Sequence, residues 1–274
     1  MSEGLRFGFL GAGKMATALA AGWLRAGLAS RDRIMASDPL LGAREGFAAT
    51  TGAFVTSDNL HVVNSSDVII LAVKPQTLHD LLSEVRAAFS PQALTISIAA
   101  GITIRQLQQM LPGECRLVRV MPNTPCLVGS SATGFTPAAT ATEDDIALVD
   151  RLFNAVGKAY RLPEHLLDAV TGLSGSGPAF VAVIIEALAD AGVRMGLPRT
   201  VALNLAAQTV LGTAKMILKE GYHPARLKDD VASPGGTTMA GLFVLEKSGV
   251  RAALMEAVEA ATRRATELGK SRDG

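Results

Sequence analysis

Three glycine-rich stretches, two of which also contain hydroxyl side chains, carry the residues whose types and spacing could bind a ligand in this 274-residue chain. The first reads Gly11-x-Gly13-x-x-Ala16 and follows an apolar run. In this pattern the first glycine permits a tight turn, the second lets a pyrophosphate approach the backbone, and the small third residue allows close packing of a helix on a strand. The phosphates would meet the amides and positive dipole of a helix amino terminus. The motif therefore predicts a dinucleotide site.

The same residues also match the first seven positions of a nucleoside-triphosphate loop, from Gly8 to Lys14. That loop needs Ser or Thr at the next position, because its hydroxyl holds magnesium, and this chain has Met15 there. Gly8 also lies inside the expected strand rather than in the loop. We therefore prefer the dinucleotide interpretation.

The choice of dinucleotide depends on the end of the second expected strand, which reads Ala36-Ser37-Asp38-Pro39. An acidic residue at the tip of this strand binds the ribose hydroxyls of NAD, whereas NADP needs room and donors for its 2′-phosphate. If Ser37 occupies the tip, a 2′-phosphate can be accepted, and if Asp38 does, NADH is favoured. The sequence leaves both possibilities open.

The other two stretches are Asp168–Ala179 and Leu227–Thr238, in a half of the chain that is otherwise helical. Each places hydroxyl groups and unshielded backbone amides just before an expected helix. Free amides at a helix start bind anions such as a carboxylate. Capping by Ser and Thr explains one such stretch without a ligand. Two stretches of this richness favour a bound substrate.

Composition excludes several other classes of partner. The chain has 26 basic and 25 acidic side chains, so it lacks the positive electrostatic field that attracts nucleic acid. Only 4% of its residues are aromatic, so it offers few rings on which bases could stack. Its two cysteines form no CxxC and its four histidines are scattered, which predicts no metal site and two cysteines buried in a reduced compartment. The most apolar expected helix, Pro178–Val193, is shorter than the roughly 20 residues that span a bilayer. We expect a cytoplasmic protein that binds a small molecule and no membrane.

Residues 1–163 alternate short apolar runs with helical patterns, which indicates a mostly parallel, doubly wound α/β sheet. The expected strands are Leu5–Leu10, Ile34–Ser37, Val68–Val73, Leu94–Ile98 and Leu117–Met121. Each stops at small, turn-forming or charged residues, and ligands of such sheets bind at the carboxyl ends of the strands. We therefore expect the site at this edge.

Residues 164–274 contain no convincing strand and predict an all-α domain. The expected helices are Pro178–Val193, Pro198–Leu218, Met239–Lys247 and Arg251–Leu268. The first is apolar on nearly all faces, so it requires cover from a bundle or a second subunit. A helical domain of about 110 residues has a limited core of its own. We expect a homodimer formed through this domain.

Taken together, the chain resembles the pyrroline-5-carboxylate reductases over nearly its whole length. The motifs that occur in the order of that family are the glycine loop, Ala72-Val73-Lys74-Pro75, Ala99-Ala100-Gly101, Met121-Pro122-Asn123-Thr124-Pro125, Thr171–Pro178 and Ser233–Thr238. The last two are highly specific, whereas many dehydrogenases share the first. The resemblance implies a Rossmann domain followed by a helical dimerisation domain, with dimers that often assemble into decamers. It also implies reduction of a cyclic imine to L-proline by NADPH, or by NADH, in the last step of proline biosynthesis.

The resemblance further assigns roles to individual residues. For the cofactor, it implies that the pyrophosphate is lined by Gly11, Ala12, Gly13, Lys14 and Met15, the adenosine end by Ser37 and Asn59, and the ribose and nicotinamide by Ala72, Val73, Lys74, Pro75, Ala99, Ala100 and Gly101. For the substrate, it implies contacts from Ser176, Ser233, Gly235, Gly236, Thr237 and Thr238. The backbone amides of Ser233–Thr238 would hold the carboxylate, with the Thr238 hydroxyl near the imine nitrogen.

A pyrroline imine is easily protonated and then accepts hydride readily, so the enzyme need not supply a strong acid. Its task is to hold the nicotinamide C4 and the imine carbon about 3–3.5 Å apart. We expect Thr238 to donate or relay a hydrogen bond to the ring nitrogen. Lys74 is an alternative general acid, but its position before Pro75 better fits a cofactor contact.

Two other functions remain as alternatives. A dehydrogenase of a small hydroxy acid needs a Lys or His facing the substrate, and the candidates Lys215, Lys219 and His223 lie outside the glycine-rich stretches. A dinucleotide-binding regulator without turnover would keep the first loop but would need no further amide-rich turns. The presence of both kinds of loop favours the enzyme.

Overall fold

The computed structural model of the protein describes residues 4–270. These residues form two units, one comprising the chain up to Ser176 together with the residues from Glu259 onward, the other comprising Gly177–Val258. The first unit therefore extends beyond the boundary expected at residue 163, and it also includes the end of the last helix, α12 (Val250–Lys270).

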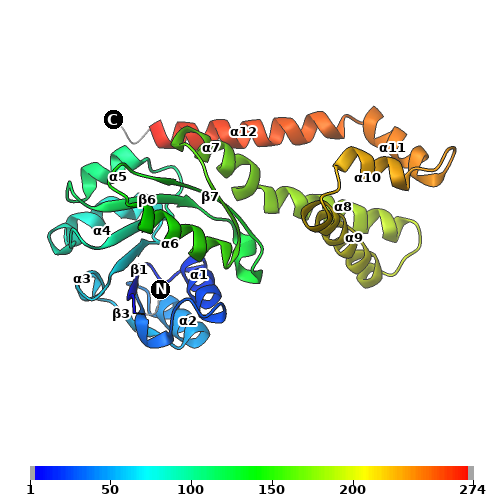
Figure 1. Ribbon diagram of the computed structural model, residues 1–274. Helices are drawn as coiled ribbons and strands as arrows, with labels where there is room; N and C mark the ends of the chain where they lie inside the picture. The colour runs from blue at the N-terminus through cyan, green and yellow to red at the C-terminus, as the bar shows by residue number, and fades with distance from the viewer. Residues whose placement is uncertain (1–3, 271–274) are drawn as a thin grey trace. The chain divides into compact units, whose positions relative to one another are not determined.

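The first unit is built on an eight-stranded sheet with the order β3-β2-β1-β4-β5-β6-β7-β8 (Figure 1). Its strands are β1 (Phe7–Leu10), β2 (Ile34–Ser37), β3 (Phe54–Thr56), β4 (Val68–Leu71), β5 (Leu94–Ser97), β6 (Arg116–Met121), β7 (Ser131–Pro137) and β8 (Gly157–Arg161). Neighbouring strands pair in parallel except β6 and β7, which are antiparallel. The predicted mostly parallel, doubly wound sheet is confirmed, with β3, β7 and β8 in addition to the expected strands.

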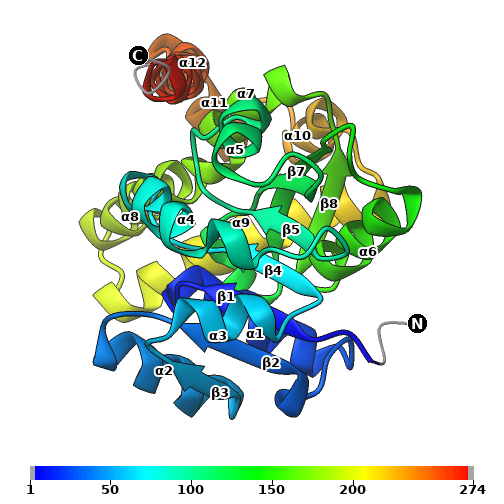
Figure 2. The same cartoon turned by 90° about the vertical axis from the view of Figure 1, so that its left-hand side faces the viewer.

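Helices cover both faces of this sheet (Figure 2). One face packs against α1 (Lys14–Arg25), α2 (Leu41–Thr51) and α6 (Glu143–Asn154), and the other against α3 (Asn59–Asn64), α4 (Leu78–Val85) and α5 (Ile104–Met110). All four residues of β4 are buried because both faces are covered, which is why that strand is a continuous apolar run.

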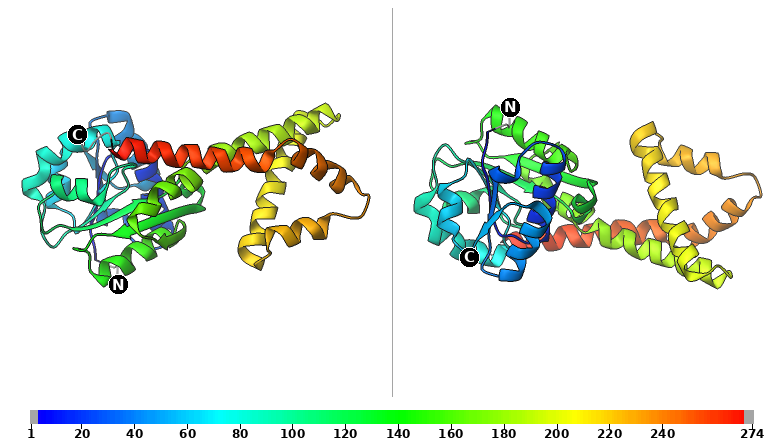
Figure 3. Two further views of the ribbon diagram at one scale, coloured as in Figure 1. Left: turned by 90° about the horizontal axis from the view of Figure 1, so that it is seen from above. Right: turned by 90° about the horizontal axis from the view of Figure 1, so that it is seen from below.

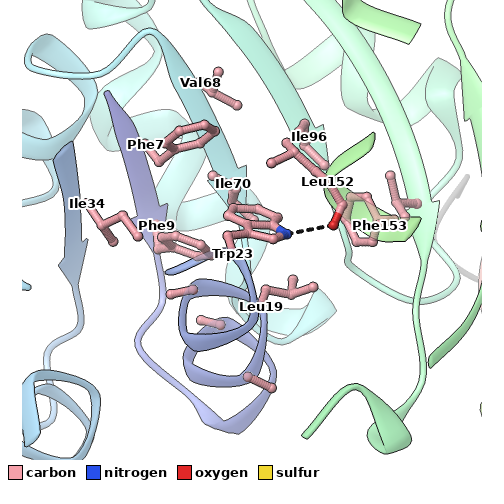
Figure 4. Close-up of a cluster of buried hydrophobic side chains, with 14 of the residues drawn as sticks. Phe7, Phe9, Leu19, Trp23, Ile34, Val68, Ile70, Ile96, Leu152 and Phe153 are labelled. Carbon is pink, nitrogen blue, oxygen red and sulfur yellow. Dashed lines mark hydrogen bonds between the residues drawn. The ribbon is translucent and has the colours of Figure 1, made fainter. Parts of the chain in front are cut away.

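Trp23 of α1 lies at the centre of the first core layer (Figure 4). Its ring centroid is 5.5 Å from those of Phe7 and Phe9, and its Nε1–H donates to the carbonyl of Leu152 at 2.9 Å. A buried indole N–H needs such a partner. This hydrogen bond connects α1 to α6, two helices that cover the same face of the sheet.

The second unit is helical throughout, which confirms the predicted all-α domain (Figure 3). It contains α8 (Gly177–Arg194), α9 (Arg199–Glu220), α10 (Pro224–Val231), α11 (Thr237–Lys247) and the start of α12. Gly192 permits the close approach of α8 and α9, since a Cβ there would lie 3.0 Å from the Cβ of Ala202. Only a small cluster, centred on Ala189, Ala202 and Ala206, is buried between these helices.

Most apolar side chains of this unit are exposed within one chain. Met195, Leu218, Phe243 and Met255 are 82%, 72%, 69% and 73% exposed. Among the described residues, two helical stretches, 164–194 and 199–220, are long and apolar enough to cross a membrane, and only 11% of the apolar segment of each is buried. The helix expected at Pro178–Val193 is part of the longer helical stretch 164–194, so its length does not argue against a membrane segment. The exposure still requires cover, as the sequence predicted.

Candidate active site

The glycine loop joins β1 to α1 at the carboxyl edge of the sheet. Gly11 has φ 104°, and a Cβ on it would lie 2.8 Å from the carbonyl oxygen of Ala72. Its N–H donates to the carbonyl of Ser37 at 2.8 Å. Gly11 is thus required both by its backbone conformation and by the close approach of β4.

Gly13 occupies the N-cap of α1 and is exposed, and a Cβ built on it would have no heavy atom within 4 Å. No side chain caps this helix, so the amides of its first turn, which includes Lys14 and Met15, remain available to an anion. The open space beside Gly13 and these amides fit the pyrophosphate of a dinucleotide. The remaining loop residue, Ala12, is buried.

The end of β2 resolves the ambiguity between Ser37 and Asp38. Ser37 is fully buried, and its Oγ has no hydrogen-bond partner among residues 4–270. The next residue, Asp38, is partly exposed and accepts hydrogen bonds from the N–H of Ala12 at 3.0 Å and of Leu40 at 2.9 Å. Asp38 therefore occupies the tip of the strand beside the glycine loop. Asn59 opens α3 on the surface, where its side-chain amide donates to Glu84.

The two motifs expected near the ribose and nicotinamide follow neighbouring parallel strands. Ala72, Val73, Lys74 and Pro75 continue β4, and Ala99, Ala100 and Gly101 follow β5. Lys74 is exposed and precedes a short 3₁₀ turn, Pro75–Thr77. A hollow of about 320 Å³ lies beside Pro75 and Ile102. The structure thus brings both motifs and the glycine loop to one edge of the sheet.

Gly101 also marks where the last helix meets this edge. It has φ 72°, and a Cβ there would lie 3.9 Å from the amide nitrogen of Gly269 in α12. The side chain of Gln106 donates to the carbonyl of Gly269 at 3.1 Å. The end of α12 therefore packs directly beside the strand ends that form the cofactor edge.

A buried arginine, Arg119 of β6, anchors the same region, and the sequence analysis missed it. Its side chain is 6% exposed and lies 2.9 Å from Glu164 and 3.7 Å from Asp168. Glu164 also accepts the N–H of Ile104 at 2.6 Å, and Asp168 accepts the hydroxyl of Thr266 at 2.9 Å. The network joins β6, the start of α5, the segment before α8 and α12. The available signal was a charged residue inside an expected strand of a parallel sheet, because such strands are covered on both faces.

The glycine-rich stretch from Thr171 is not a loop that precedes a helix. Residues Thr171–Gly175 form a π-helical turn between α7 (Leu167–Val170) and α8, and the N–H of Ser176 donates to the carbonyl of Thr171 at 2.9 Å. The amide of Ser176 is therefore already bonded, and its hydroxyl is the group left for a ligand. Single π turns inside α-helices are frequent at functional sites.

Asn123, from the motif after β6, holds this π turn. Its Nδ2 donates to the carbonyl of Ser174 at 2.8 Å, while its Oδ1 accepts the N–H of Ala132 at 2.9 Å and the hydroxyl of Ser131 at 3.1 Å. Asn123 is 7% exposed, so its amide is fully used inside the protein. The motif thus contributes a fixed polar support rather than a free side chain.

The second glycine-rich stretch does precede a helix. Gly235 has φ 68°, the N–H of Gly236 donates to the carbonyl of Ser233 at 3.0 Å, and Gly236 is the N-cap of α11. No side chain caps α11, which leaves the amides of its first turn for an anion. Thr237 is exposed and Thr238 is half-buried. Both threonines lie in that first turn, within an 11-residue helix.

The two cysteines and His223 have structural roles. Cys115 and Cys126 are buried, and burial raises the pKa of both thiols, that of Cys126 to about 11. His223 caps α10, with its Nδ1 accepting the N–H of Ala225 at 3.3 Å. In the described part of the chain, no group of three or more His, Cys, Asp or Glu side chains could hold a metal ion.

Comparison with known proteins adds independent evidence. A family model for pyrroline-5-carboxylate reductase dimerisation matches residues 164–268, and a model for NADP oxidoreductase, coenzyme F420-dependent, matches residues 6–101. A pyrroline-5-carboxylate reductase from Methanosarcina acetivorans is 48% identical over 268 residues, which cover 98% of this chain and 99% of that protein. The Arabidopsis thaliana pyrroline-5-carboxylate reductase is 49% identical over 271 residues, covering 98% of each chain.

A solved structure agrees with these matches. The crystal structure of Plasmodium falciparum pyrroline carboxylate reductase with NADP bound has a TM-score of 0.88 and 35% sequence identity, covering 97% of this chain and 99% of that one. The similarity extends over both units, and it confirms the resemblance that the order of the motifs predicted. The chain belongs to the pyrroline-5-carboxylate reductase family.

Proposed function

We propose that this protein reduces 1-pyrroline-5-carboxylate to L-proline with a reduced nicotinamide dinucleotide. The single observation that carries the proposal is the full-length similarity to pyrroline-5-carboxylate reductases. The geometry supports it with two separate anion-binding helix starts, at α1 and at α11. The first suits a pyrophosphate and the second suits a carboxylate, so both partners of the reaction have a place.

The residues at the carboxyl edge fit the cofactor. The open space beside Gly13 admits the pyrophosphate to the backbone, and the motifs after β4 and β5 line the neighbouring strand ends. When bound, the reduced nicotinamide supplies a hydride, which adds to the imine carbon while the ring nitrogen carries a proton. The chain's own contribution here is orientation: Gly11 keeps the loop against Ala72, and Asn123 holds both the π turn at Ser174 and the start of β7 at Ala132.

The loop before α11 supports carboxylate binding. Gly235 and Thr237 present backbone amides at the uncapped helix start, where the helix dipole favours negative charge, and Ser233 and Thr237 add hydroxyls. The N–H of Gly236 is bonded to the carbonyl of Ser233, so Gly236 would contribute by keeping the turn open. Thr238 lies one residue further, half-buried. Its hydroxyl would donate to the ring nitrogen or relay a proton to it, and the hydroxyl of Ser176 is a further substrate contact.

The helical unit supports dimer formation. Its largely exposed apolar side chains require cover, and the family model that matches this region is named for dimerisation. A second copy of the chain is therefore the proposed partner, in a homodimer that assembles further into a decamer. Cover by a second copy also explains the apolar helices without a membrane, in agreement with a cytoplasmic enzyme.

The test follows the near-UV absorbance of reduced nicotinamide with and without 1-pyrroline-5-carboxylate. Imine-dependent oxidation is the expected result. Thr238→Ala should lower kcat/KM about 10- to 100-fold, because one lost polar contact in a dry site costs about 1–3 kcal/mol. Thr50→Ala, on the exposed surface of α2 in the first unit, is the matched control. A folded protein that binds the dinucleotide but oxidises none of it with the imine would refute the substrate assignment.

A further inference from the structure

Asp38 stands where a Rossmann domain distinguishes between the two nicotinamide dinucleotides. The residue that closes the second strand faces the adenosine ribose, where NAD carries a 2′-hydroxyl and NADP a 2′-phosphate. In this chain the closing residue is beside the glycine loop, since the Asp38 Oδ2 accepts the N–H of Ala12 at 3.0 Å. That distance places a carboxylate at the same loop that fits the pyrophosphate.

Ser37, the other candidate for this role, cannot reach a ligand. It is the last residue of β2 and pairs with Leu10 in the sheet register. Its side chain has no exposed surface, and its hydroxyl lies in the interior without a partner among the described residues. A serine at the strand tip would have offered a 2′-phosphate a neutral donor, but this chain presents an acidic side chain instead.

The carboxylate of Asp38 keeps free acceptor capacity. It accepts one backbone N–H on each oxygen, from Ala12 and from Leu40, and a carboxylate offers about four acceptor positions. The remaining positions can accept the ribose hydroxyls of NADH. A 2′-phosphate is also acceptor-only near neutral pH, so it gains no hydrogen bond from the carboxylate and is repelled by its charge.

Arg44 of α2 places a positive charge beside Asp38. Its guanidinium donates from Nη1 to the carbonyls of Asp38 at 2.6 Å and Pro39 at 3.0 Å, and it forms no ion pair with the Asp38 carboxylate. The remaining N–H groups of the guanidinium can contact a 2′-phosphate, because arginine presents five donors. Arg44 therefore reduces the repulsion between the Asp38 carboxylate and a 2′-phosphate, but it does not remove the preference for a 2′-hydroxyl.

We infer that Asp38 sets the dinucleotide specificity of this reductase, so that NADH binds at least as tightly as NADPH. Asp38 accepts the ribose hydroxyls of NADH, whereas NADPH binds only as far as Arg44 offsets the charge of Asp38. This inference rests on the proposed function for its dinucleotide site, and it goes beyond that function by naming the residue that selects the cofactor.

The experiment measures the dissociation constants of NADH and NADPH by calorimetry on the full chain, without the imine. The readout is the ratio of the two constants. In Asp38→Ser, which removes the charge, the ratio should change at least 10-fold in favour of tighter NADPH binding. Asp38→Asn should change it in the same direction. In Arg44→Met the ratio should move toward NADH. Asp32→Asn makes the same change of charge at the other end of β2, beside its first residue Ile34, and should leave the ratio unchanged.

The ratio of the two dissociation constants is insensitive to a general disturbance of the glycine loop. Loss of the hydrogen bond to Ala12 would weaken the binding of NADH and NADPH alike, and the ratio would stay the same. A wild-type protein that binds NADPH more than 10-fold tighter than NADH would overturn the inference, as would an unchanged ratio in both Asp38 variants. Binding of neither dinucleotide would overturn the site itself. A protein that binds NADH with the expected ratio but does not reduce the imine would refute the proposed function alone.

Discussion

Gly11 and Gly13 lie two residues apart in one loop, yet the structure predicts that alanine at each position has a different consequence. At Gly11 the backbone φ is 104°, a region that costs an L-residue about 1–3 kcal/mol. The added methyl would also lie 2.8 Å from the carbonyl oxygen of Ala72, a backbone atom that cannot rotate away. Overpacking of this kind costs about 1–3 kcal/mol more. We expect Gly11→Ala to lower the free energy of unfolding by about 2–6 kcal/mol.

Gly13→Ala should leave folding nearly unchanged and weaken dinucleotide binding. The φ of Gly13 is −73°, which any residue adopts, and the new methyl would have no atom within 4 Å. Surface changes of this kind usually alter stability by no more than about 0.5 kcal/mol. The methyl would, however, fill the space through which a pyrophosphate reaches the amides. Losing one hydrogen bond to a charged group costs about 1.5–3 kcal/mol, so the dissociation constant should rise about 10- to 100-fold.

The assay combines urea unfolding, followed by circular dichroism at one fixed protein concentration, with calorimetric titration of the dinucleotide. The fixed concentration matters because the stability of an oligomer depends on it. If Gly13→Ala destabilises the fold as much as Gly11→Ala, the space beside Gly13 is not open. If Gly11→Ala is as stable as the wild-type protein, the close approach of Ala72 does not constrain the loop. Either result would refute the division of roles between the two glycines.

Two further predictions concern groups outside the loop. Arg119→Met should lower the free energy of unfolding by about 2–4 kcal/mol in urea titrations, because it leaves the carboxylates of Glu164 and Asp168 without their buried partner. A loss below about 0.5 kcal/mol would contradict that reasoning. Burial raises the pKa of Cys126 to about 11 from its ordinary 9.0, so between these values the unfolded chain loses the thiol proton while the folded protein keeps it. Stability should therefore fall as the pH rises from 9 to 11, by up to about 1.4 kcal/mol per pH unit from this thiol. Cys126→Ala should show a smaller fall over the same range, and an identical slope in the two proteins would contradict the prediction.

Local chemistry determined much of this protein in advance. The apolar run that became β4 predicted a strand, and the loop from Gly11 to Ala16 predicted a turn into a helix. These features follow from steric limits and burial within a few neighbouring residues, so the sequence alone contains them. The alternation of strands and helices then implied the mostly parallel sheet. The motif order predicted the family, since the motifs extend over nearly the whole chain and the two highly specific ones lie together in its helical half.

Other features depended on partners far along the chain. β7 and β8 were not among the expected strands, and they are placed in the sheet by pairing with β6 and with each other. The π turn at Thr171–Gly175 is rich in residues that favour loops, but Asn123, 51 residues before Ser174, holds it by a hydrogen bond. Tertiary contacts override local preference at such positions.

The site divides in the same way. The sequence could name Ser37 and Asp38 as candidates for the strand tip, but only the pairing of β2 with β1 decided which side chain is buried. A charged Arg119 inside a strand is favourable only because Glu164, 45 residues later, comes within 2.9 Å of it. Residue types and spacing therefore determined which chemistry is possible. Strand register and the pairing of buried charges decided which residues are exposed at the site and which are buried. The reason is physical: burial and electrostatics depend on distances in space, which a linear pattern does not contain.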